Sequence, residues 1–575
     1  MLFSQLAVYL QKLDETSSRN TITELLADLF RRASADEIGK LCYLLQGRVA
    51  PLYEETEFGM ADKFMIRAIA LAYGADQSVV LKTFKEHGDL GKTASALHTG
   101  KTEKLEVTDA YIQLRAIAET NGTGSQEKKI QLLADMLKRV DATAACYIVR
   151  IPLDKLRLGF SEMTILDSLS WMLAGDKSLR SRLEDAYNVR PDIGYISETV
   201  KKEGIAGLSH VRARVGSPVL AELCQRLPNA AEMIKKMGNV AVEPKYDGVR
   251  VQIHVIRARN GGVKISTYSR NLEPTTDMFP ELSEIGKEVD AREAILDCEA
   301  VGLDPVTGKI SSFQETSTRK RKHDIDEARK SVPLRFFVFD ILYKDGKDFL
   351  STPLSERRSI LEHTVKPGRL LSISPQIVTD KADELRRYHD EQLRVGLEGV
   401  VVKKWNSLYE PGRRGYSWVK FKEEEGKDGK LTDTIDAVVM GYYLGEGKRT
   451  GFGIGALLVG VRKGEQFETV TKIGTGVTDA LWKTLQKQLH AIEVRGVPKE
   501  YDAVHKTLIP DVWTRPLIVV ELAGDDLTKS PTHGAGYAVR FPRLVRIRKD
   551  KRPADATTVS ELTRMFENQM SHTKK

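Results

Sequence analysis

One stretch decides how the rest of the chain is interpreted: Glu243-Pro244-Lys245-Tyr246-Asp247-Gly248-Val249-Arg250. Its lysine follows a short strand-forming run and precedes a glycine turn. Lysine is nucleophilic only as the neutral amine, so it needs desolvation or a neighbouring positive charge, which Arg250 could supply. Gly248 would let the backbone approach a ligand closely. Taken alone, Lys-x-Asp-Gly is short enough to arise by chance, and a surface lysine in a hairpin turn is the simpler interpretation.

Further runs follow in a fixed order and change that interpretation. They are Tyr268-Ser269-Arg270-Asn271, Leu296-Asp297-Cys298-Glu299-Ala300, Phe337-Val338-Phe339-Asp340, Leu397–Lys403, Arg414–Lys422 and, near the C-terminus, Arg540–Arg548. The ordered series resembles the nucleotidyltransferase motifs of the covalent ligase and capping-enzyme superfamily. A whole set in order is far more specific than any one of its members. The resemblance implies that Lys245 is the catalytic nucleophile and forms a phosphoramidate with AMP, with ATP as co-substrate.

The resemblance also implies roles for the other motif residues. Glu299 and Glu398 are expected to bind Mg²⁺, or Mn²⁺ in its place, because carboxylates suit such hard ions. Phe339 is expected to stack on adenine, and Glu243 to accept from the adenine amino group, which would select ATP over GTP. The full set expected at the nucleotide is Glu243, Arg250, Arg270, Glu299, Phe339, Arg414, Lys420 and Lys422. Of these, Lys420 and Lys422 would contact the α-phosphate, and Glu299 would also touch the ribose.

Each of these residues has a plainer interpretation when it is considered alone. Phe339 lies in an apolar strand and could be core. Lys420 and Lys422 alternate with apolar residues, as on the exposed face of an amphipathic strand. Glu299 and Glu398 could be solvated carboxylates. Only the joint pattern favours the functional interpretation.

Changes in apolar spacing and composition along the sequence predict three domains. Residues 1–212 have apolar residues at helical spacing, for example in Ile22–Arg32, Asp62–Tyr73 and Lys128–Val140, and form an all-α domain. Residues 213–427 mix helical stretches with β-branched strands, which predicts an α+β nucleotidyltransferase (adenylation) domain. Residues 428–575, after the charged stretch Glu423–Lys430, are expected to form a C-terminal β-barrel of the OB-fold type.

The helical region decides between substrates. Its runs Arg48–Glu54, Gly124–Lys129, Ile148–Gly159 and Ala186–Val189 resemble the DNA-binding domain of archaeal and eukaryotic replicative ATP-dependent DNA ligases. This resemblance covers essentially the whole chain and implies sealing of nicked double-stranded DNA in replication, repair and recombination. Gly124 and Gly159, near expected helix starts, could present backbone N–H groups to phosphates. The basic run Arg319–Lys322 could face DNA or be a solvated loop.

Composition is compatible with this interpretation but does not require it. The chain has 575 residues, 41% of them hydrophobic, and a net charge of +8, which permits a polyanionic partner. The four cysteines are dispersed and are expected to be mostly buried thiols, which argues against zinc-bearing NAD-dependent ligases. No membrane segment or signal peptide is expected, so a cytoplasmic, nucleoid-associated protein is predicted.

Several alternatives stay open at the level of sequence. An RNA guanylyltransferase or RNA ligase would share the core, and a nick-binding scaffold could keep the motifs without turnover. A sliding-clamp partner is in doubt, because Lys101–Leu105 lacks the glutamine and aromatic residues of a clamp motif. The run Gly88–Thr93 resembles a phosphate loop but lacks its first glycine, so it is interpreted as a helix start. The family resemblance implies a monomer.

Overall fold

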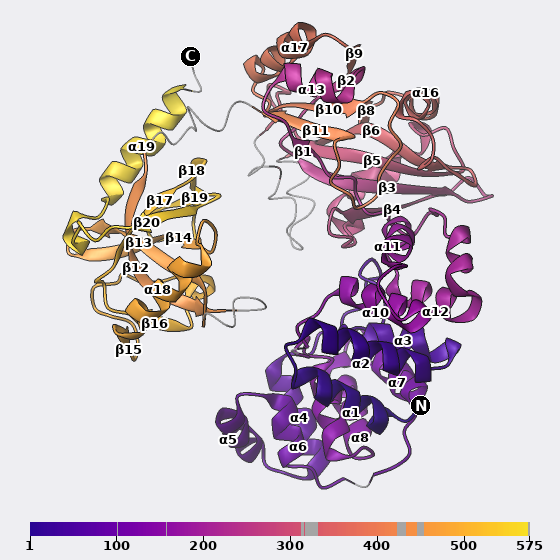
Figure 1. The fold of residues 1–575 in the computed structure, drawn as a ribbon, viewed down its shortest axis with the longest axis vertical. Helices are drawn as coiled ribbons and strands as arrows, with labels where there is room; N and C mark the ends of the chain where they lie inside the picture. The colour runs from indigo at the N-terminus through magenta and orange to yellow at the C-terminus, as the bar shows by residue number, and fades with distance from the viewer. Residues whose placement is uncertain are drawn as a thin grey trace. The chain divides into compact units, whose positions relative to one another are not determined.

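The computed structural model describes residues 1–100, 102–156, 158–311, 316, 332–422, 433–445 and 453–572. These form two packed units, Met1–Phe421 and Lys422–Lys575. Helices make up the first part of the first unit and two β-sheets make up the rest (Figure 1). The second unit is mainly antiparallel β-strand.

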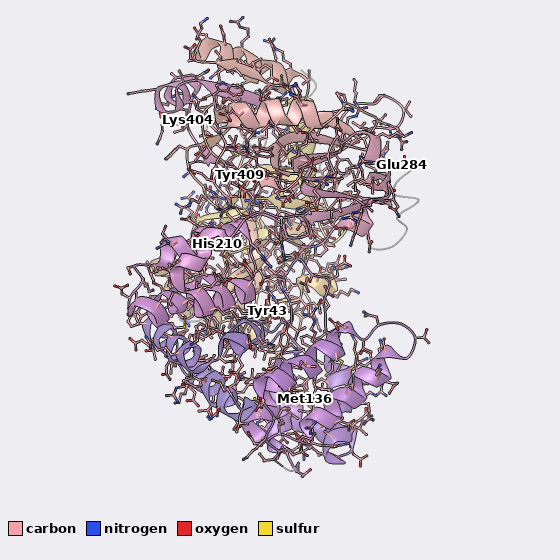
Figure 2. All side chains as sticks on the ribbon, turned by 90° about the vertical axis from the view of Figure 1, so that its right-hand side faces the viewer. Tyr43, Met136, His210, Glu284, Lys404 and Tyr409 are labelled. Atoms are coloured by element: carbon pink, nitrogen blue, oxygen red, sulfur yellow. The ribbon has the colours of Figure 1, made fainter. Side chains whose placement is uncertain are left out.

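Residues 1–203 are helical, as predicted. The helices are α1 (Phe3–Asp14), α2 (Arg19–Arg32), α3 (Ala35–Leu44), α4 (Asp62–Tyr73), α5 (Gln77–His87), α6 (Leu90–Ala96), α7 (Val107–Glu119), α8 (Ser125–Leu137), α9 (Ala142–Arg150), α10 (Glu162–Ala174), α11 (Arg180–Val189) and α12 (Ile193–Glu203). Their apolar faces share one continuous core, which includes Leu26, Leu133 and Ile148. Met136, labelled in Figure 2, belongs to this core. Apolar residues recur at helical spacing in the sequence because each helix buries one apolar stripe.

Local chemistry sets several helix starts. Helix α6 begins after Asp89, whose Oδ1 accepts from the backbone N–H of Lys92 at 2.9 Å. This confirms that the run resembling a phosphate loop is a helix start. Helix α8 begins at Ser125, earlier than the predicted Lys128–Val140, because Gly124 takes a left-handed conformation with φ 77° as its N-cap.

The second part of the first unit contains two sheets. One has the order β1-β11-β10-β2-β9, and the other has the order β4-β3-β5-β6-β7 with β8 beside β6. The strands are β1 (Gln225–Arg226), β2 (Val240–Pro244), β3 (Val249–Arg257), β4 (Val263–Ser269), β5 (Glu293–Gly302), β6 (Leu334–Lys344), β7 (Lys347–Asp348), β8 (Leu371–Ile373), β9 (Ile377–Thr379), β10 (Gly399–Lys404) and β11 (Trp418–Lys422). The helices among them are α13 (Ala230–Met237), α16 (Leu354–Thr364) and α17 (Ala382–Arg394). The mixed α/β architecture is confirmed.

The helical and α/β parts of the first unit pack directly on each other. The backbone N–H of Leu220 donates to the Asn188 carbonyl at 2.9 Å. The Tyr53 ring meets the Tyr268 ring edge-on, with centroids 6.4 Å apart. Asn188 leaves no room for a side chain at Gly412, where a Cβ would come within 2.9 Å of it. Helix α11 therefore holds the loop that leads to Arg414.

The second unit is an antiparallel β region with two helices, α18 (Asp479–His490) and α19 (Val559–His572), among its described residues. Its main sheet runs β14-β13-β12-β16-β15, with β17 joining β12 to β20. Its strands are β12 (Ile435–Leu444), β13 (Ile454–Lys463), β14 (Gln466–Ile473), β15 (Glu493–Val494), β16 (Val512–Thr514), β17 (Val519–Ala523), β18 (Asp526–Lys529), β19 (Tyr537–Arg540) and β20 (Arg543–Ile547). The OB-fold assignment stays a prediction.

The predicted borders fall between elements. The border at residue 212 follows a 3-10 turn, Gly204–His210, and lies within the first unit. The border at residue 427 lies between β11 and β12, and the charged stretch Glu423–Lys430 is outside the described residues. In the described part of the chain, no single helix has the length and apolarity to cross a membrane. Helices α4 and α5 meet that test only as a pair bent by 117°.

Candidate active site

Lys245 lies directly after strand β2. Its backbone N–H donates to the Gly399 carbonyl at 2.9 Å, and its own carbonyl accepts from the Glu398 N–H at 3.3 Å. The lysine is thus fixed to the first residues of β10. Its Nζ forms an ion pair with the Glu398 carboxylate, and the lysine side chain is 22% exposed. The lysine predicted to be the nucleophile and a carboxylate able to take its proton are therefore in contact.

Position 248 requires glycine because its backbone lies close to the backbone of β5. A Cβ at this position would come within 2.4 Å of the Ala300 carbonyl oxygen and 2.9 Å of Glu299 Cγ. Real Cβ atoms do not approach oxygen so closely, so any side chain here would displace β5. The close approach at Gly248 is to strand β5, and its predicted approach to a ligand stays a prediction.

Glu299 is the second carboxylate close to the lysine. It lies on β5 opposite Arg250 of β3. Burial raises the pKa of Glu299 to about 7, against the opposing influence of the Arg250 and Lys245 charges. A carboxyl group with such a pKa changes its charge near neutral pH and gains most from a cation beside it.

The carboxylates fit a divalent ion that also binds phosphates. Among the described residues, no three His, Cys, Asp or Glu side chains are grouped so as to hold a metal by themselves. Mg²⁺ usually keeps several waters and takes one or two carboxylates plus the phosphates of a nucleotide. Glu299 and Glu398, both close to Lys245, supply that donor set.

Arg250 is held more tightly than the sequence suggests. Its guanidinium donates to both carboxylate oxygens of Asp297, at 3.0 and 2.7 Å, and to the Glu222 carbonyl at 2.7 Å. Tyr409, labelled in Figure 2, donates to the same Asp297 at 2.8 Å. Asp297 offsets much of the positive charge that Arg250 was expected to offer Lys245. Arg250 is therefore a fixed hydrogen-bond donor, and sequence reasoning missed its partner Asp297.

Phe339 lies among cations and a second aromatic ring. It is half-buried on β6, and its ring meets Trp418 edge-on with centroids 6.0 Å apart. The guanidinium carbon of Arg250 is 5.3 Å from the Phe339 ring centroid. Lys403 Nζ, at 4.7 Å from the same centroid, donates to Glu243 Oε1 at 2.8 Å. The structure thus brings Glu243, Phe339 and Arg250 together. Lys403 carried no predicted role, because a lysine ending an apolar strand looks like a surface residue.

The remaining predicted cations lie on β11, in the loop before it and just after β4. Lys420 and Lys422 are half-buried on β11 and alternate with buried Val419 and Phe421. Arg414 is exposed in the loop before β11. Arg270 is exposed just after β4 and lines a small pocket together with Arg250 and Asp297.

Two other sets of predicted residues are not among the described residues of the first unit. Arg540 and Arg543 belong to the second unit, where they form ion pairs with Asp526 and Asp525 at 3.9 and 3.1 Å. The basic run Arg319–Lys322 lies outside the described residues.

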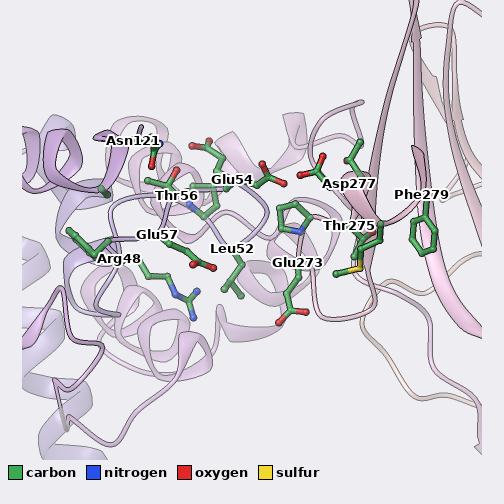
Figure 3. A pocket seen from close by; sticks show the side chains of 18 of the residues that line it. Arg48, Leu52, Glu54, Thr56, Glu57, Asn121, Glu273, Thr275, Asp277 and Phe279 are labelled. Carbon is green, nitrogen blue, oxygen red and sulfur yellow. The ribbon is translucent and has the colours of Figure 1, made fainter. Parts of the chain in front are cut away.

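A separate cavity is lined by none of the residues expected at the nucleotide. It has a volume of about 1740 Å³ and lies between the loop 47–58 and residues 263–283 (Figure 3). Its charged lining is mostly acidic, with Glu54, Glu57, Glu273 and Asp277 against Arg48. Such a lining repels phosphates, so the cavity is a poor candidate for ATP.

Family models match three successive parts of the chain. Residues 2–170 match "DNA ligase N terminus", residues 218–422 match "ATP dependent DNA ligase domain", and residues 450–551 match "ATP dependent DNA ligase C terminal region". One solved structure, titled "Pmar-Lig_Pre.", has a TM-score of 0.52 and 17% identity over 94% of this chain and 99% of its own. That likeness concerns the fold alone.

Curated relatives match nearly end to end. The "Probable DNA ligase" of Dictyoglomus thermophilum is 42% identical over 99% of this chain and 98% of its own length. The "DNA ligase" of Acidianus ambivalens is 37% identical, and that of Saccharolobus solfataricus 36% identical, each over 99% of this chain and 98% of its own length. Together with the three domain matches, these similarities show that the chain belongs to the ATP-dependent DNA ligase family.

Proposed function

We propose that this ATP-dependent DNA ligase seals nicks in duplex DNA through an AMP bound covalently to Lys245. The observation that carries the proposal is the contact between Lys245 Nζ and Glu398, with Glu299 close by. This arrangement joins a nucleophile, a group to receive its proton and a carboxylate pair suited to a divalent ion.

The first step is attack of Lys245 Nζ on the α-phosphorus of ATP. The N–P bond forms, the bond to the β-phosphate breaks, and pyrophosphate leaves. Glu398 is the carboxylate positioned to take the proton that the ammonium must lose before attack. Mg²⁺, or Mn²⁺ on the same oxygens, would be held by Glu299 and Glu398 and would offset charge on the phosphate oxygens.

Two further steps complete the reaction. The 5′-phosphate at the nick attacks the lysyl-AMP, so that a P–O–P bond forms, the N–P bond breaks and the lysine regains its proton. The 3′-hydroxyl then attacks the activated 5′-phosphorus and expels AMP, which leaves a phosphodiester bond. Lys420 and Lys422 are assigned to the α-phosphate, and Arg250, Arg270 and Arg414 to the nucleotide or the nick phosphate. Such fixed donors act by stabilising charge that develops on oxygen.

The base and the DNA are assigned to separate surfaces. Phe339 stacks on adenine, and Glu243 accepts from its amino group. The helical region contacts phosphates of the duplex, and helix α8 presents the N-terminal end of its first turn next to Gly124, where the Ser125 N–H already donates to the Gly122 carbonyl at 3.1 Å. In the second unit, the strand carrying Lys472 is assigned to a DNA grip, and Arg540 and Arg543 to the ATP step. The protein acts as a monomer, and a sliding-clamp contact is not part of the proposal.

The test is incubation of the wild type and Lys245→Ala with α-³²P-labelled ATP and Mg²⁺, followed by a denaturing gel and a chase with nicked duplex. We expect label on the wild type only, discharged as the nick is sealed. Lys404→Ala is a matched control, because this exposed lysine on β10 belongs to no part of the site (Figure 2). Absence of wild-type label, with DNA binding retained, would favour a scaffold role. Preference for GTP or for single-stranded RNA ends would favour the capping-enzyme or RNA-ligase alternatives.

A further inference from the structure

Lys403 is a buried cation to which the proposed reaction gives no role. Its side chain is 1% exposed, although it is the fifth residue of the short strand β10. Its Nζ donates to Glu243 Oε1 on β2 at 2.8 Å and to the Phe339 carbonyl on β6 at 3.2 Å. Strands β2 and β10 belong to one sheet and β6 to the other. Lys403 therefore links the two sheets at the end of the site assigned to the base.

The aromatic residues around it support that location. Lys403 Nζ is 4.7 Å from the Phe339 ring centroid and 4.3 Å from the Trp418 ring centroid. A cation at such distances is attracted by the faces of both rings. Its counter-ion, Glu243, has a side chain only 4% exposed. The charge pair thus lies out of water and next to the ring that is assigned to adenine.

The protonation state of the Glu243 carboxyl depends on the groups around it. Burial raises the pKa of Glu243, the Lys403 charge is the largest influence in the opposite direction, and Arg358 adds to it. Asp340 raises the pKa further. Tyr246 and Tyr388 also face the carboxyl. Loss of the Lys403 charge would therefore leave Glu243 more readily protonated.

Protonation would change what the carboxyl can recognise. An ionised carboxylate only accepts hydrogen bonds, and it has two oxygens, so the Lys403 contact on Oε1 is compatible with a second donor on Oε2. A protonated carboxyl carries an O–H donor as well. Adenine presents an amino donor at position 6 of the purine, whereas guanine and hypoxanthine present a carbonyl acceptor there. The two charge states of Glu243 thus match different bases.

We propose that Lys403 determines the base specificity of the ligase by holding Glu243 as an acceptor only, so that a purine with a 6-amino group is bound and a 6-oxo purine is rejected. Lys403 is then a positioning residue that acts through Glu243. The inference rests on the proposed function, in which Glu243 receives the adenine amino group.

The experiment compares lysyl-nucleotide formation from ATP, GTP and ITP in the wild type and in Lys403→Gln. Glutamine can still donate to Glu243 but carries no charge. ITP isolates the effect of position 6. Hypoxanthine has the 6-oxo group of guanine but lacks the 2-amino group by which guanine also differs from adenine. We expect the ratio of kcat/KM for ATP to that for ITP to fall by about tenfold or more in Lys403→Gln, mainly through KM. Lys403→Arg should restore much of the ratio, and the exposed neighbour Lys404→Gln should leave it unchanged.

A folded Lys403→Gln with the wild-type ATP-to-ITP ratio would overturn the inference. If that variant does not fold, Glu243→Gln gives a second test. Its uncharged amide presents a donor beside an acceptor, as a protonated carboxyl does, so the ATP-to-ITP ratio should fall in the same way. A folded Glu243→Gln with the wild-type ratio would also contradict the inference. Absence of label from any nucleotide in the wild type would instead contradict the proposed function.

Discussion

At the scale of single residues, the motif lysine and its two carboxylates come together as the sequence series implies. The residues that hold them were harder to predict. Asp297 and Tyr409, which fix Arg250, are 112 residues apart in the chain and meet only through the packing of β5 against a distant loop. A sequence pattern reports neighbours along one strand, so partners on separate strands give no periodic signal.

Gly248 provides a test at this scale. Gly248→Ala should slow lysyl-AMP formation by about a hundredfold, because the new Cβ would meet the Ala300 carbonyl at 2.4 Å and push Glu299 from its place. The rate of label incorporation from ATP is the measurement, with circular dichroism to confirm folding. Gly262→Ala is a suitable control, since the nearest neighbour of its Cβ is the side-chain oxygen of Asn260 at 3.2 Å. A folded Gly248→Ala with full activity would show that β5 tolerates the displacement.

At the scale of secondary-structure elements, the long strands and most helices were predictable from apolar periodicity. The β-branched runs Val249–Val255, Ala294–Val301 and Leu334–Leu342, which the sequence predicts to be strands, form β3, β5 and β6 with ends within a few residues. Very short strands were not predicted. Strand β1 has two residues, and it pairs with β11 only because of tertiary packing. Two residues cannot display an alternating pattern.

Strand β3 also anchors the connector between the helical and α/β parts. His254 Nδ1 accepts from the Gly216 N–H at 2.9 Å, and His254 Nε2 lies 3.0 Å from Gln252 Oε1. Gln252 in turn exchanges two hydrogen bonds with the backbone of Val219. Burial lowers the pKa of His254 to about 3, so the fold requires the neutral ring. Protonation would replace the acceptor at Nδ1 by a donor.

Because the pKa of His254 is lowered in the folded protein, acid should destabilise the fold. The contribution of His254 to stability is complete above pH 6.5, the ordinary pKa of histidine, and is lost as the pH falls towards 3. At pH 4.5 the loss should be about 2–3 kcal/mol. Urea unfolding of the wild type and His254→Gln at pH 7 and pH 4.5 measures it, since glutamine can accept and donate without titrating. Equal acid sensitivity in the two proteins would rule out His254 as the cause.

At the scale of the whole molecule, the chain divides into two units with separate apolar cores. The cores of the helical and α/β parts lie within residues 1–421, and those of the β region lie within residues 435–562. The sequence predicted borders at residues 212 and 427 from changes in composition and a charged stretch, and these borders stay predictions. Composition does not reveal how tightly neighbouring domains pack, so it could not show that the helical and α/β parts pack into one unit.

This division gives a prediction for a shortened chain. Residues 1–432 should fold, because they keep their cores, but should form lysyl-AMP from ATP at least about a hundredfold more slowly, because Arg540 and Arg543 are lost. Sealing of a nick that already carries AMP on its 5′-phosphate should also slow in this shortened chain, because the strand that carries Lys472 is lost. In the full chain, Arg540→Ala/Arg543→Ala should slow the ATP step and affect this sealing step much less, because sealing releases no pyrophosphate. Both rates can be measured on the same preparation. If residues 1–432 formed lysyl-AMP at the full rate, the two arginines would have no role in the first step.

Peptide mass spectrometry of the wild type after incubation with ATP and Mg²⁺ shows which residue carries the AMP. We expect AMP on the peptide that contains Lys245, attached to its Nζ, and loss of that modification when nicked duplex is added. AMP on another residue, or modification of Lys245 that persists while nicks are sealed, would contradict this expectation.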